Sequence, residues 1–428
     1  MRINVIGSGY VGTTLAACLA DLGHDVLAID IDEDVVAALE DGRAPIHEPG
    51  LDDLVAEHTG RNLNATTSYE RVPEATATFL AIQTPSREDG SIDAAPLAAA
   101  AEMTGDALAG TDDDHLVVVK STITPPALEA VRTALFDAVG DTPGRIGLAT
   151  NPEFLREGTS VEDFLTPEKL VFGADEEWAT ERLEAVYEPL LVEHDAHVVR
   201  TDPTTAMMIK YANNAFLATK ISLINDIGNV CKEFGVDAYE VADAIGLDDR
   251  IGERFLRSGV GFGGSCFPKD VAAIIAAAET EGYTPPVLDA AVELNDHQPE
   301  RMLDLLDEHV DVADRRVAVL GLAFKPGTDD TRNSRAIPII EGLQERGADV
   351  VGYDPVATEN MSQRFPGIKY VDSAAKALNG AYGALVVTDW DEFATLDDEF
   401  DTMAQPVIID GRRIIEPTTK IVYEGLTW

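Results

Sequence analysis

Residues 261–270, Gly-Phe-Gly-Gly-Ser-Cys-Phe-Pro-Lys-Asp, combine a flexible backbone with three groups that can do chemistry. Glycines remove side chains where a backbone must come close to something. Cys266 is followed by Lys269 and Asp270, and a nearby cation favours the thiolate, the nucleophilic form of cysteine. A thiolate attacks carbonyls, and a carboxylate can activate the water that releases the product. The alternative is a glycine-rich loop with a buried cysteine, followed by a helix with Pro268 in its first turn.

The composition indicates a folded, strongly acidic protein of two or three domains. The 428 residues carry a formal charge of −45, with 77 acidic residues against 32 basic ones, and 45% of them are hydrophobic. Such apolar content argues against disorder. An acid-rich, lysine-poor surface indicates adaptation to a very salty cytoplasm, because at molar salt a Debye length of about 3 Å screens self-repulsion. We expect no nucleic-acid partner, since phosphate binding needs basic patches.

The cysteines and the start of the chain indicate a cytoplasmic compartment. Cys18, Cys231 and Cys266 form no CxxC pair and no disulfide framework, which fits a reducing environment, and no metal is predicted. The N-terminus lacks a cationic signal-peptide start, and no apolar run approaches the roughly 20 residues of a membrane span. We expect a soluble protein without a membrane partner, in which Cys18 and Cys231 are structural.

The first thirty residues predict a dinucleotide-binding unit. A strand at 3–6 precedes the glycine turn 7–12, which is followed by an apolar helix and by a strand that ends in Asp30. Glycines in this pattern let a pyrophosphate approach a helix N-terminus, and an acid at this spacing contacts a ribose. No arginine closely follows Asp30, so NAD is favoured over NADP. The predicted cofactor contacts here are Gly7, Gly9, Tyr10, Val11, Gly12 and Asp30.

Two further predicted strands place hydroxyl side chains at their carboxyl ends. Residues 78–82 lead to Thr84, and residues 116–119 lead to Thr122. In open parallel sheets that edge is where ligands bind, although ordinary turn and helix-capping chemistry explains the hydroxyls equally well.

A strand at 146–149 leads to residues 151–158, Asn-Pro-Glu-Phe-Leu-Arg-Glu-Gly. Glu153 and Glu157 would share one face of a helix. They fit either a solvated pair or an acid/base pair, and the spacing does not decide between them.

Residues 204–234 predict one long amphipathic helix, which would span roughly 45 Å. Lys210 and Asn214 lie four residues apart and share a face. A helix of this length is typical of a scaffold or a dimer interface. Apolar residues surround Lys210, so we expect it to be more than a solvated lysine.

The C-terminal part repeats the N-terminal pattern. A strand at 315–320, a glycine turn, a helix and a strand ending in Asp354 predict a second Rossmann-like domain with degenerate glycines. One loop carries Lys325, Arg332 and Arg335, and the last strand leads to Arg412 and Arg413. These cations suggest a second phosphate-bearing ligand. The predicted fold class is therefore α/β, with two Rossmann-like doubly wound domains joined by a long central helix.

Together these motifs resemble the UDP-glucose 6-dehydrogenase family, over nearly the whole chain. The runs at 151–158 and 261–270 are typical of nucleotide-sugar dehydrogenases that oxidise a C6 alcohol to a carboxylate, and 324–332 also matches. Residues 158–164 and Phe267 are more similar to the UDP-glucose branch than to GDP-mannose dehydrogenase. The chain departs from the usual pattern at Gln83 and Gly327, which affects loop detail and not the reaction.

The resemblance implies a four-electron oxidation of UDP-glucose to UDP-glucuronate with two NAD⁺, through a thiohemiacetal and a thioester on Cys266. The implied catalytic residues are Cys266, Lys210, Asp270, Asn214, Glu153 and Thr122. The implied cofactor contacts add Thr84, Thr122, Glu157, Lys269 and Arg332 to the glycine turn. The implied substrate contacts are Glu153, Phe154, Leu155, Lys210, Asn214, Arg250, Phe255, Gly263, Lys325 and Arg412.

The resemblance also implies a division of the chain and a partner copy. Residues 1–198 form the predicted NAD-binding domain, 199–298 a central helical dimerisation domain, and 299–428 a UDP-sugar-binding domain. In this family Arg250 reaches the substrate of a neighbouring subunit, so a homodimer or a higher homo-oligomer is expected.

Other activities stay open at this point. The same chemistry on GDP-mannose or a UDP-N-acetylhexosamine is the first alternative. A two-electron β-hydroxyacid dehydrogenase needs neither a nucleophilic Cys266 nor residues 315–428, and an NAD-responsive scaffold leaves the reactive set unexplained.

Overall fold

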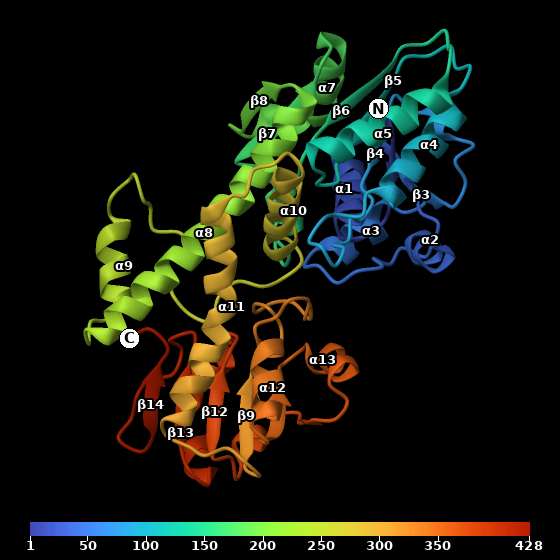
Figure 1. Cartoon of the computed structure of the whole chain (residues 1–428). Helices are drawn as coiled ribbons and strands as arrows, with labels where there is room; N and C mark the ends of the chain where they lie inside the picture. Colours follow the sequence, from blue (N-terminus) through green and yellow to red (C-terminus); the bar gives the residue numbers. More distant parts are fainter. The chain divides into compact units, whose positions relative to one another are not determined.

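The structure, a computed structural model that describes all 428 residues, forms two compact α/β units (Figure 1). The first unit comprises residues 1–213 and 272–281, and the second comprises residues 214–271 and 282–428. Helices α8 (Pro203–Glu233) and α10 (Phe267–Thr280) each run from one unit into the other.

Helix α8 confirms the long helix predicted from the sequence, with ends that differ by one residue. Asp202 precedes it and accepts a hydrogen bond from the Thr205 backbone N–H at 2.9 Å, while Pro203 takes the first helical position, where no N–H is needed. Shortly after the helix ends, Gly235 adopts φ +65, a conformation that favours glycine.

The first unit is built on an eight-stranded sheet in the order β3-β2-β1-β4-β5-β6-β7-β8. The first six strands are parallel, β7 runs antiparallel to β6, and β8 is parallel to β7. Its strands are β1 (Arg2–Ile6), β2 (Asp25–Ile29), β3 (Leu63–Thr66), β4 (Ala77–Leu80), β5 (His115–Val119), β6 (Ile146–Thr150), β7 (Lys169–Ala174) and β8 (His197–Thr201). Its helices are α1 (Tyr10–Asp21), α2 (Glu33–Glu40), α3 (Leu51–His58), α4 (Ala95–Leu108), α5 (Pro125–Val139), α6 (Ser160–Leu165) and α7 (Glu177–Glu193).

Helices cover both faces of this sheet, so its central strands are apolar on both sides. In β5, Leu116 and Val118 pack into the cluster formed with α1 and α7, while Val117 and Val119 pack into the cluster formed with α4 and α5. Burial on both faces explains the unbroken Leu-Val-Val-Val run of this strand. The carboxyl ends of β1 and β4 meet where the strand order reverses, which is the ligand-binding edge of such sheets.

The second unit contains a six-stranded, all-parallel sheet in the order β11-β10-β9-β12-β13-β14 (Figure 1). This order is the 3-2-1-4-5-6 arrangement of a Rossmann fold, so the predicted second domain of this class is confirmed. Its strands are β9 (Arg316–Leu320), β10 (Asp349–Tyr353), β11 (Lys369–Tyr370), β12 (Gly383–Val386), β13 (Val407–Asp410) and β14 (Val422–Gly425). Its helices are α9 (Ala238–Gly246), α11 (Pro286–Asp307), α12 (Ala336–Glu345), α13 (Thr358–Arg364) and α14 (Ala374–Leu378).

The part of α8 that belongs to the second unit carries an exposed apolar stripe. Phe216, Leu223 and Val230 repeat every seven residues, and their side chains are 72%, 57% and 52% exposed. Phe234, directly after the helix, is 79% exposed. None of the helices in the chain is both long and apolar enough to span a membrane.

Candidate active site

The glycine turn after β1 leaves no room for a side chain at two of its positions. A Cβ on Gly12 would lie 1.7 Å from the backbone oxygen of Gly7, and Gly7 itself has φ +92. The Ser8 hydroxyl is buried in this turn without a hydrogen-bond partner. A tight turn with close backbone approach and an unused polar atom fits a cofactor pyrophosphate at the start of α1.

Asp30 follows β2 at the same edge of the sheet and supports the glycine turn. Its Oδ2 accepts a hydrogen bond from the Ser8 backbone N–H at 2.5 Å, and its Oδ1 accepts from the Asp32 N–H at 3.0 Å. These two contacts leave acceptor positions on the carboxylate, as a ribose hydroxyl requires.

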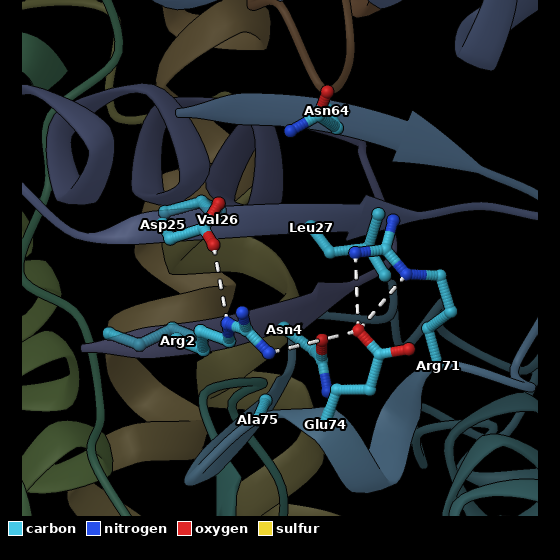
Figure 2. A pocket seen from close by; sticks show the side chains of 10 residues that line it. Arg2, Asn4, Asp25, Val26, Leu27, Asn64, Arg71, Glu74 and Ala75 are labelled. Carbon is cyan, nitrogen blue, oxygen red and sulfur yellow. Dashed lines mark hydrogen bonds and ion pairs between the residues drawn. The ribbon is translucent and has the colours of Figure 1, made fainter. Parts of the chain in front are cut away.

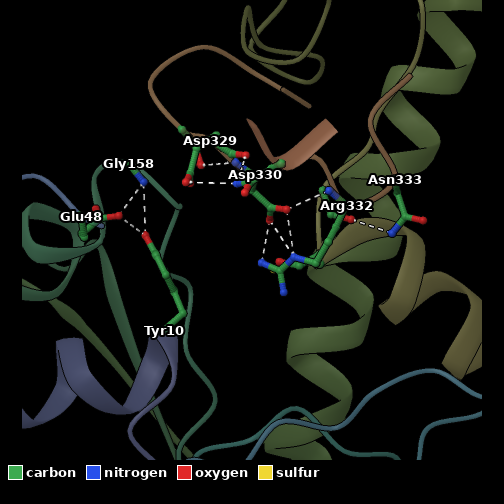
Figure 3. A network of polar contacts seen from close by, with 12 residues as sticks. Tyr10, Glu48, Gly158, Asp329, Asp330, Arg332 and Asn333 are labelled. Carbon is green, nitrogen blue, oxygen red and sulfur yellow. Dashed lines mark hydrogen bonds and ion pairs between the residues drawn. The ribbon is translucent and has the colours of Figure 1, made fainter. Parts of the chain in front are cut away.

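Tyr10, at the start of α1, is tied to a buried carboxylate that the sequence reasoning missed (Figure 3). Glu48 accepts hydrogen bonds from the Tyr10 hydroxyl, from the Gly158 N–H at 2.8 Å and from the Ser160 N–H at 2.6 Å. Burial and the Glu48 carboxylate raise the pKa of Tyr10, so its hydroxyl stays a donor, and the charge of Glu157 acts in the same direction. Glu48 therefore links the glycine turn to the loop that begins α6.

The hydroxyl residues after β4 and β5 hold two loops together at the ligand-binding edge. The Thr84 hydroxyl donates to the Thr122 backbone oxygen at 3.1 Å, and the Ser121 hydroxyl donates to the Ile82 oxygen at 2.6 Å. The structure therefore places Thr84 and Thr122 beside each other, while their roles stay predictions.

Residues 151–158 do not form a helix, so the expectation that Glu153 and Glu157 share a helical face is wrong. Helix α6 begins only at Ser160, and the run before it is an irregular turn. Pro152 disfavours a helical start, and Glu153 Oε2 instead accepts the Leu155 N–H at 2.6 Å. Glu153 is buried and Glu157 is half-buried.

Glu153 forms a buried ion pair with Lys210 of α8. Lys210 Nζ lies 2.8 Å from Glu153 Oε1, and both side chains are almost fully buried. Burial alone would raise the pKa of Glu153, but the charge and hydrogen bond of Lys210 outweigh it and hold that pKa below its ordinary value. Glu153 is therefore held as an anion, and Lys210 is the cation beside it.

Two more lysines surround the same turn, and sequence reasoning assigned a role to neither. Lys120, directly after β5, donates to Asn151 Oδ1 at 2.8 Å. Lys169 Nζ lies 4.2 Å from the centre of the Phe154 ring, and Lys210 Nζ lies 5.4 Å from it. The rarity of lysine in the sequence could have pointed to these residues, because only ten lysines occur in the chain.

In the second unit, Cys266 is exposed and directly precedes α10. The Asp270 backbone N–H donates to the Cys266 oxygen at 2.8 Å, which starts the helix with Pro268 in its first turn. The alternative interpretation of the sequence expected this helix start, but the buried cysteine that it also expected is wrong. A helix N-terminus favours the thiolate. The buried Asp270 carboxylate accepts hydrogen bonds from Asn214 Nδ2 at 2.6 Å and from Lys269 Nζ at 2.7 Å.

The glycines of residues 261–264 make room for the chain itself. A Cβ on Gly261 would lie 2.4 Å from the Asn295 side chain, and Gly261 has φ +94. A Cβ on Gly263 would lie 2.3 Å from the Asn333 backbone oxygen, and one on Gly264 would lie 2.7 Å from the Phe324 ring. Close packing against the rest of the chain thus explains why these positions are glycine, and no ligand is needed to explain them.

The cations predicted to bind substrate (Lys325 and Arg412) and cofactor (Arg332) have local partners. Arg412 Nε donates to the Val387 oxygen at 2.7 Å, and Lys325 Nζ lies 5.4 Å from the Phe324 ring centre. Arg332 pairs with Asp330 in its own loop (Figure 3).

Arg250 and Phe255 lie on the loop between α9 and α10. Arg250 pairs with Asp248, yet its side chain is 88% exposed. Phe255 has φ +64, a strained backbone conformation for an aromatic residue, and its ring lies 6.4 Å from that of Phe267.

The glycine turn of the second sheet is closed by its own acid. Asp354 Oδ2 accepts from the Leu322 and Ala323 N–H groups at 2.7 and 3.0 Å and from Trp390 Nε1 at 3.0 Å. Its Oδ1 accepts from the Val356 and Ala357 N–H groups. Asp354 therefore satisfies the amides that would meet a phosphate, unlike Asp30 in the first unit.

A small hollow at the opposite edge of the first sheet carries no chemistry (Figure 2). It measures about 20 Å³ and lies at the amino ends of β1 and β2. Arg2 bridges Asp25 at 3.5 Å and Glu74 at 4.0 Å across it. Parallel sheets bind ligands at the carboxyl ends of their strands, so this hollow is structural.

Comparisons with known proteins agree with this geometry along the whole chain. Family models for the UDP-glucose/GDP-mannose dehydrogenases match residues 1–191 (NAD binding domain), 204–297 (central domain) and 318–417 (UDP binding domain). The chain belongs to the UDP-glucose/GDP-mannose dehydrogenase family. It is an NAD-dependent oxidoreductase with nucleotide-sugar dehydrogenase activity, and the glycine turn, Ser8 and Asp30 fit that cofactor.

Individual members of the family are similar over their full length. The UDP-glucose 6-dehydrogenase AglM of Haloferax volcanii is 59% identical, with all of both chains covered. A UDP-glucose dehydrogenase structure from Pyrobaculum islandicum is 38% identical with a TM-score of 0.93, covering 100% of this chain and 98% of that one. A UDP-D-ManNAc dehydrogenase structure from Pyrococcus horikoshii is 28% identical with a TM-score of 0.88, covering 100% and 99%.

Proposed function

We propose that this dehydrogenase oxidises the C6 alcohol of UDP-glucose to the carboxylate of UDP-glucuronate, in two successive two-electron steps. The observation that carries the proposal is the start of α10, where the exposed Cys266 thiol stands one turn before the buried Asp270 carboxylate. A simple alcohol oxidation needs no nucleophile, whereas oxidation to the acid gains from a covalent intermediate that keeps the aldehyde on the enzyme. The 59% identity to a UDP-glucose 6-dehydrogenase supports the choice of sugar.

The covalent steps balance in atoms and electrons. When bound, NAD accepts a hydride from the substrate carbon in each oxidation. Removal of a hydride and a proton from the C6 alcohol leaves an aldehyde, to which the Cys266 sulfur adds as a thiohemiacetal. Loss of a second hydride and a proton gives a thioester. Water then cleaves the carbon–sulfur bond, which releases the acid and restores the thiol.

The buried carboxylates and cations take the protons and the developing charge. Lys210 donates to the oxygen that becomes negative when sulfur adds, and Asn214 supplies a second donor. Glu153, held as an anion by Lys210, accepts protons and helps to activate the hydrolytic water near Thr122. Asp270, which already accepts from Asn214 and Lys269, serves the same purpose beside the thiol.

The remaining predicted residues bind the two ligands. Thr84, Glu157, Lys269 and Arg332 contact the cofactor together with the glycine turn and Asp30. Phe154, Leu155, Phe255, Gly263, Lys325 and Arg412 contact the UDP-sugar. In this proposal residues 1–198 bind NAD, residues 199–298 form the dimerisation domain and residues 299–428 bind the UDP-sugar.

The apolar stripe on α8 and the outward Arg250 support a homodimer. Phe216, Leu223 and Val230 are too exposed to be core residues, and their spacing of seven matches helix-to-helix packing. Arg250 points into solvent, where it would reach the substrate of a partner copy. Leu223→Asp should give a monomer in light scattering, whereas the control Val356→Asp, at a residue 51% exposed elsewhere in the same unit, should not.

A cytoplasmic enzyme that makes a uronate donor would serve polysaccharide or glycoprotein glycan synthesis. Oxidation at C6 leaves the UDP leaving group in place, so a glycosyl transfer reaction is the class of step that consumes the product.

A substrate panel tests the choice of sugar. Purified protein in about molar KCl is offered UDP-glucose, GDP-mannose, UDP-N-acetylglucosamine and UDP-N-acetylmannosamine with NAD⁺, and products are identified by mass. We expect acid formation from UDP-glucose with kcat/KM at least about tenfold above the others, which corresponds to about 1.4 kcal/mol. Preferred oxidation of GDP-mannose or an N-acetylhexosamine would replace the substrate and keep the chemistry.

A further inference from the structure

Every lysine of the first unit lies against the same short turn. This unit contains three of the ten lysines in the chain: Lys120, Lys169 and Lys210. Lys210 pairs with Glu153 at 2.8 Å, Lys169 lies over the Phe154 ring at 4.2 Å, and Lys120 donates to Asn151 at 2.8 Å. All three lysines of the first unit therefore contact residues 151–154, in a chain that contains few lysines. Lys210 already has a proposed role, whereas Lys120 and Lys169 have none, and Lys120 is the more deeply buried of these two.

Lys120 is an amine buried at the carboxyl end of β5, with 4% of its surface exposed. Its Nζ donates to Asn151 Oδ1 at 2.8 Å and lies 3.5 Å from the Tyr187 hydroxyl. The Tyr187 hydroxyl donates to the same Asn151 oxygen at 2.6 Å, and Asn151 Nδ2 donates to the Val171 oxygen at 2.9 Å. Neutral groups thus hold Asn151 on every side except at Lys120, the one donor to it that can carry a positive charge.

Charges that face Lys120 come from the two groups proposed for proton transfer. Burial lowers the pKa of Lys120 to about 7, the Glu153 carboxylate opposes this shift, and the Lys210 ammonium adds to it. Burial raises the pKa of Tyr187 on α7 and of Cys18 on α1 behind it, so both stay neutral through this range. Lys120 is therefore the group of this cluster that changes charge near neutral pH.

We propose that Lys120 is a positioning residue for the oxidation, which sets the protonation balance of the Glu153–Lys210 pair through its own charge. The proposal rests on the roles proposed above for Glu153 and Lys210. Electrostatic coupling is reciprocal, so a charged Lys120 stabilises the Glu153 anion and weakens the hold of Lys210 on its proton. When Lys120 loses its proton, Glu153 becomes a stronger base and Lys210 holds its own proton more tightly. Turnover should therefore rise as the pH passes through neutral.

The alternative is that Lys120 only fills space and fixes Asn151, and a matched pair of variants separates the two. Lys120→Met removes the charge and keeps the length of the side chain. Tyr187→Phe removes a neutral donor from the same Asn151 oxygen and keeps the charge. A purely structural role predicts similar effects from both variants, whereas the proposal predicts that only Lys120→Met changes the pH profile.

The first experiment measures kcat from pH 5.5 to 9 for the full-length protein and both variants, with NAD⁺ and the sugar nucleotide that the native protein oxidises. We expect a rise near pH 7 in the native protein and in Tyr187→Phe, and no such rise in Lys120→Met. A native rise that persists in Lys120→Met would overturn the proposal. Loss of the rise in both variants would also overturn it, because hydrogen bonding to Asn151 would then suffice.

A second variant covers the case in which Lys120→Met does not fold. Asn151→Asp places a carboxylate at the same oxygen position, which should raise the pKa of Lys120 by about one to three units. The rise in kcat should move to higher pH by the same amount. An unmoved rise would contradict the proposal.

A stability measurement tests the coupling without turnover, so it stays informative if the sugar assignment fails. The pKa of Lys120 is lower in the folded than in the unfolded chain, so the folded state loses this proton first and stability should rise with pH above about 7. Urea midpoints from pH 5.5 to 9 should show this rise in the native protein and lack it in Lys120→Met. Glu153→Gln removes the anion that supports the charge on Lys120, so its rise should begin at lower pH. An identical onset in Glu153→Gln and the native protein would show that Lys120 and the pair are not coupled.

Discussion

Cys266, the proposed nucleophile, and Asp270, a carboxylate proposed to serve it, differ in their exposure to solvent. The thiol is exposed at the start of α10, whereas Asp270 is buried and accepts from Asn214 and Lys269. Glu153 and Lys210 form a second buried pair, in which the cation keeps the carboxylate ionised. A buried pair of this kind is costly to break, since removing one partner by mutation leaves an uncompensated charge worth about 3–5 kcal/mol.

Replacing the thiol should stop the reaction at the aldehyde. Cys266→Ser keeps the shape of the site but lacks a nucleophile that forms a thioester, so the rate of UDP-glucuronate formation should fall by a factor on the order of 10³ or more. Product analysis by chromatography measures it. Cys231→Ser, at a buried cysteine near the end of α8, is the control and should keep the native rate. Acid formation by Cys266→Ser at the native rate would rule out covalent catalysis.

The residues with a chemical signature could be named from the sequence, and their supporting neighbours could not. Cys266, Lys210 and Asp30 stand in motifs whose residue types suggest chemistry. Glu48 lies in an ordinary loop, and its importance comes from amides contributed by residues more than 100 positions away. Lys120 comes after a strand as a lysine often does at a surface, and only the fold shows that it is buried.

At the scale of elements, the glycine turn of the first sheet and the similar turn of the second sheet differ in how far a neighbouring acid fills their hydrogen bonds. Both begin at the carboxyl end of the first strand of a Rossmann-type order, and both meet an acid from the neighbouring strand. Asp30 accepts two hydrogen bonds, one of them from an amide of its turn. Asp354 accepts five, two of them from amides of its turn. The first turn is the one that can receive a pyrophosphate.

Adding one methyl group to the first turn should weaken cofactor binding. A Cβ on Gly12 would lie 1.7 Å from the Gly7 oxygen, so Gly12→Ala must open the turn at a cost of about 1–3 kcal/mol. We expect NAD⁺ to bind about 10- to 100-fold more weakly in calorimetry. Gly367→Ala is the control, because nothing lies within 4 Å of that position. Native affinity in Gly12→Ala would show that the turn does not hold the pyrophosphate.

Sequence periodicity found most of the buried strands and missed the remaining strands and the irregular turns. The strands predicted at 3–6, 116–119 and 315–320 are confirmed within a residue at each end, because burial on both faces gives a continuous apolar run. The strands that the sequence did not predict are β3, β7, β8, β11 and β14. β8 is an edge strand with partly exposed residues and β11 has two residues, whereas β7 is buried. The helix expected for Glu153 and Glu157 failed because side chain–backbone hydrogen bonds compete with helix formation.

At the scale of the whole molecule, a protein with a charge of −45 must bind two ligands that each carry a negatively charged diphosphate. Local cations cannot cancel a field of that size at low salt, because the Debye length at 0.1 M is about 10 Å. At molar KCl it falls to about 3 Å, and the repulsion of both ligands and of the chain itself is screened.

Activity should therefore depend steeply on salt. We expect kcat/KM for UDP-glucose to rise roughly tenfold or more between 0.1 M and 2 M KCl, the range expected for long-range electrostatic effects on association. Sucrose at matched osmolality is the control, because it favours the compact state without screening charge. A rise of equal size with sucrose would assign the effect to folding stability, and full activity at 0.1 M KCl would contradict the screening argument.

The central claim is a four-electron oxidation of UDP-glucose by one enzyme, and counting electrons tests it most directly. The measurement is NADH formed per UDP-glucose consumed by the purified native protein in about molar KCl, where screening is strong. The proposed chemistry predicts a ratio of about two, one hydride from each oxidation. A ratio of about one would mean that the reaction stops at the aldehyde, and the covalent role of Cys266 would have to be withdrawn.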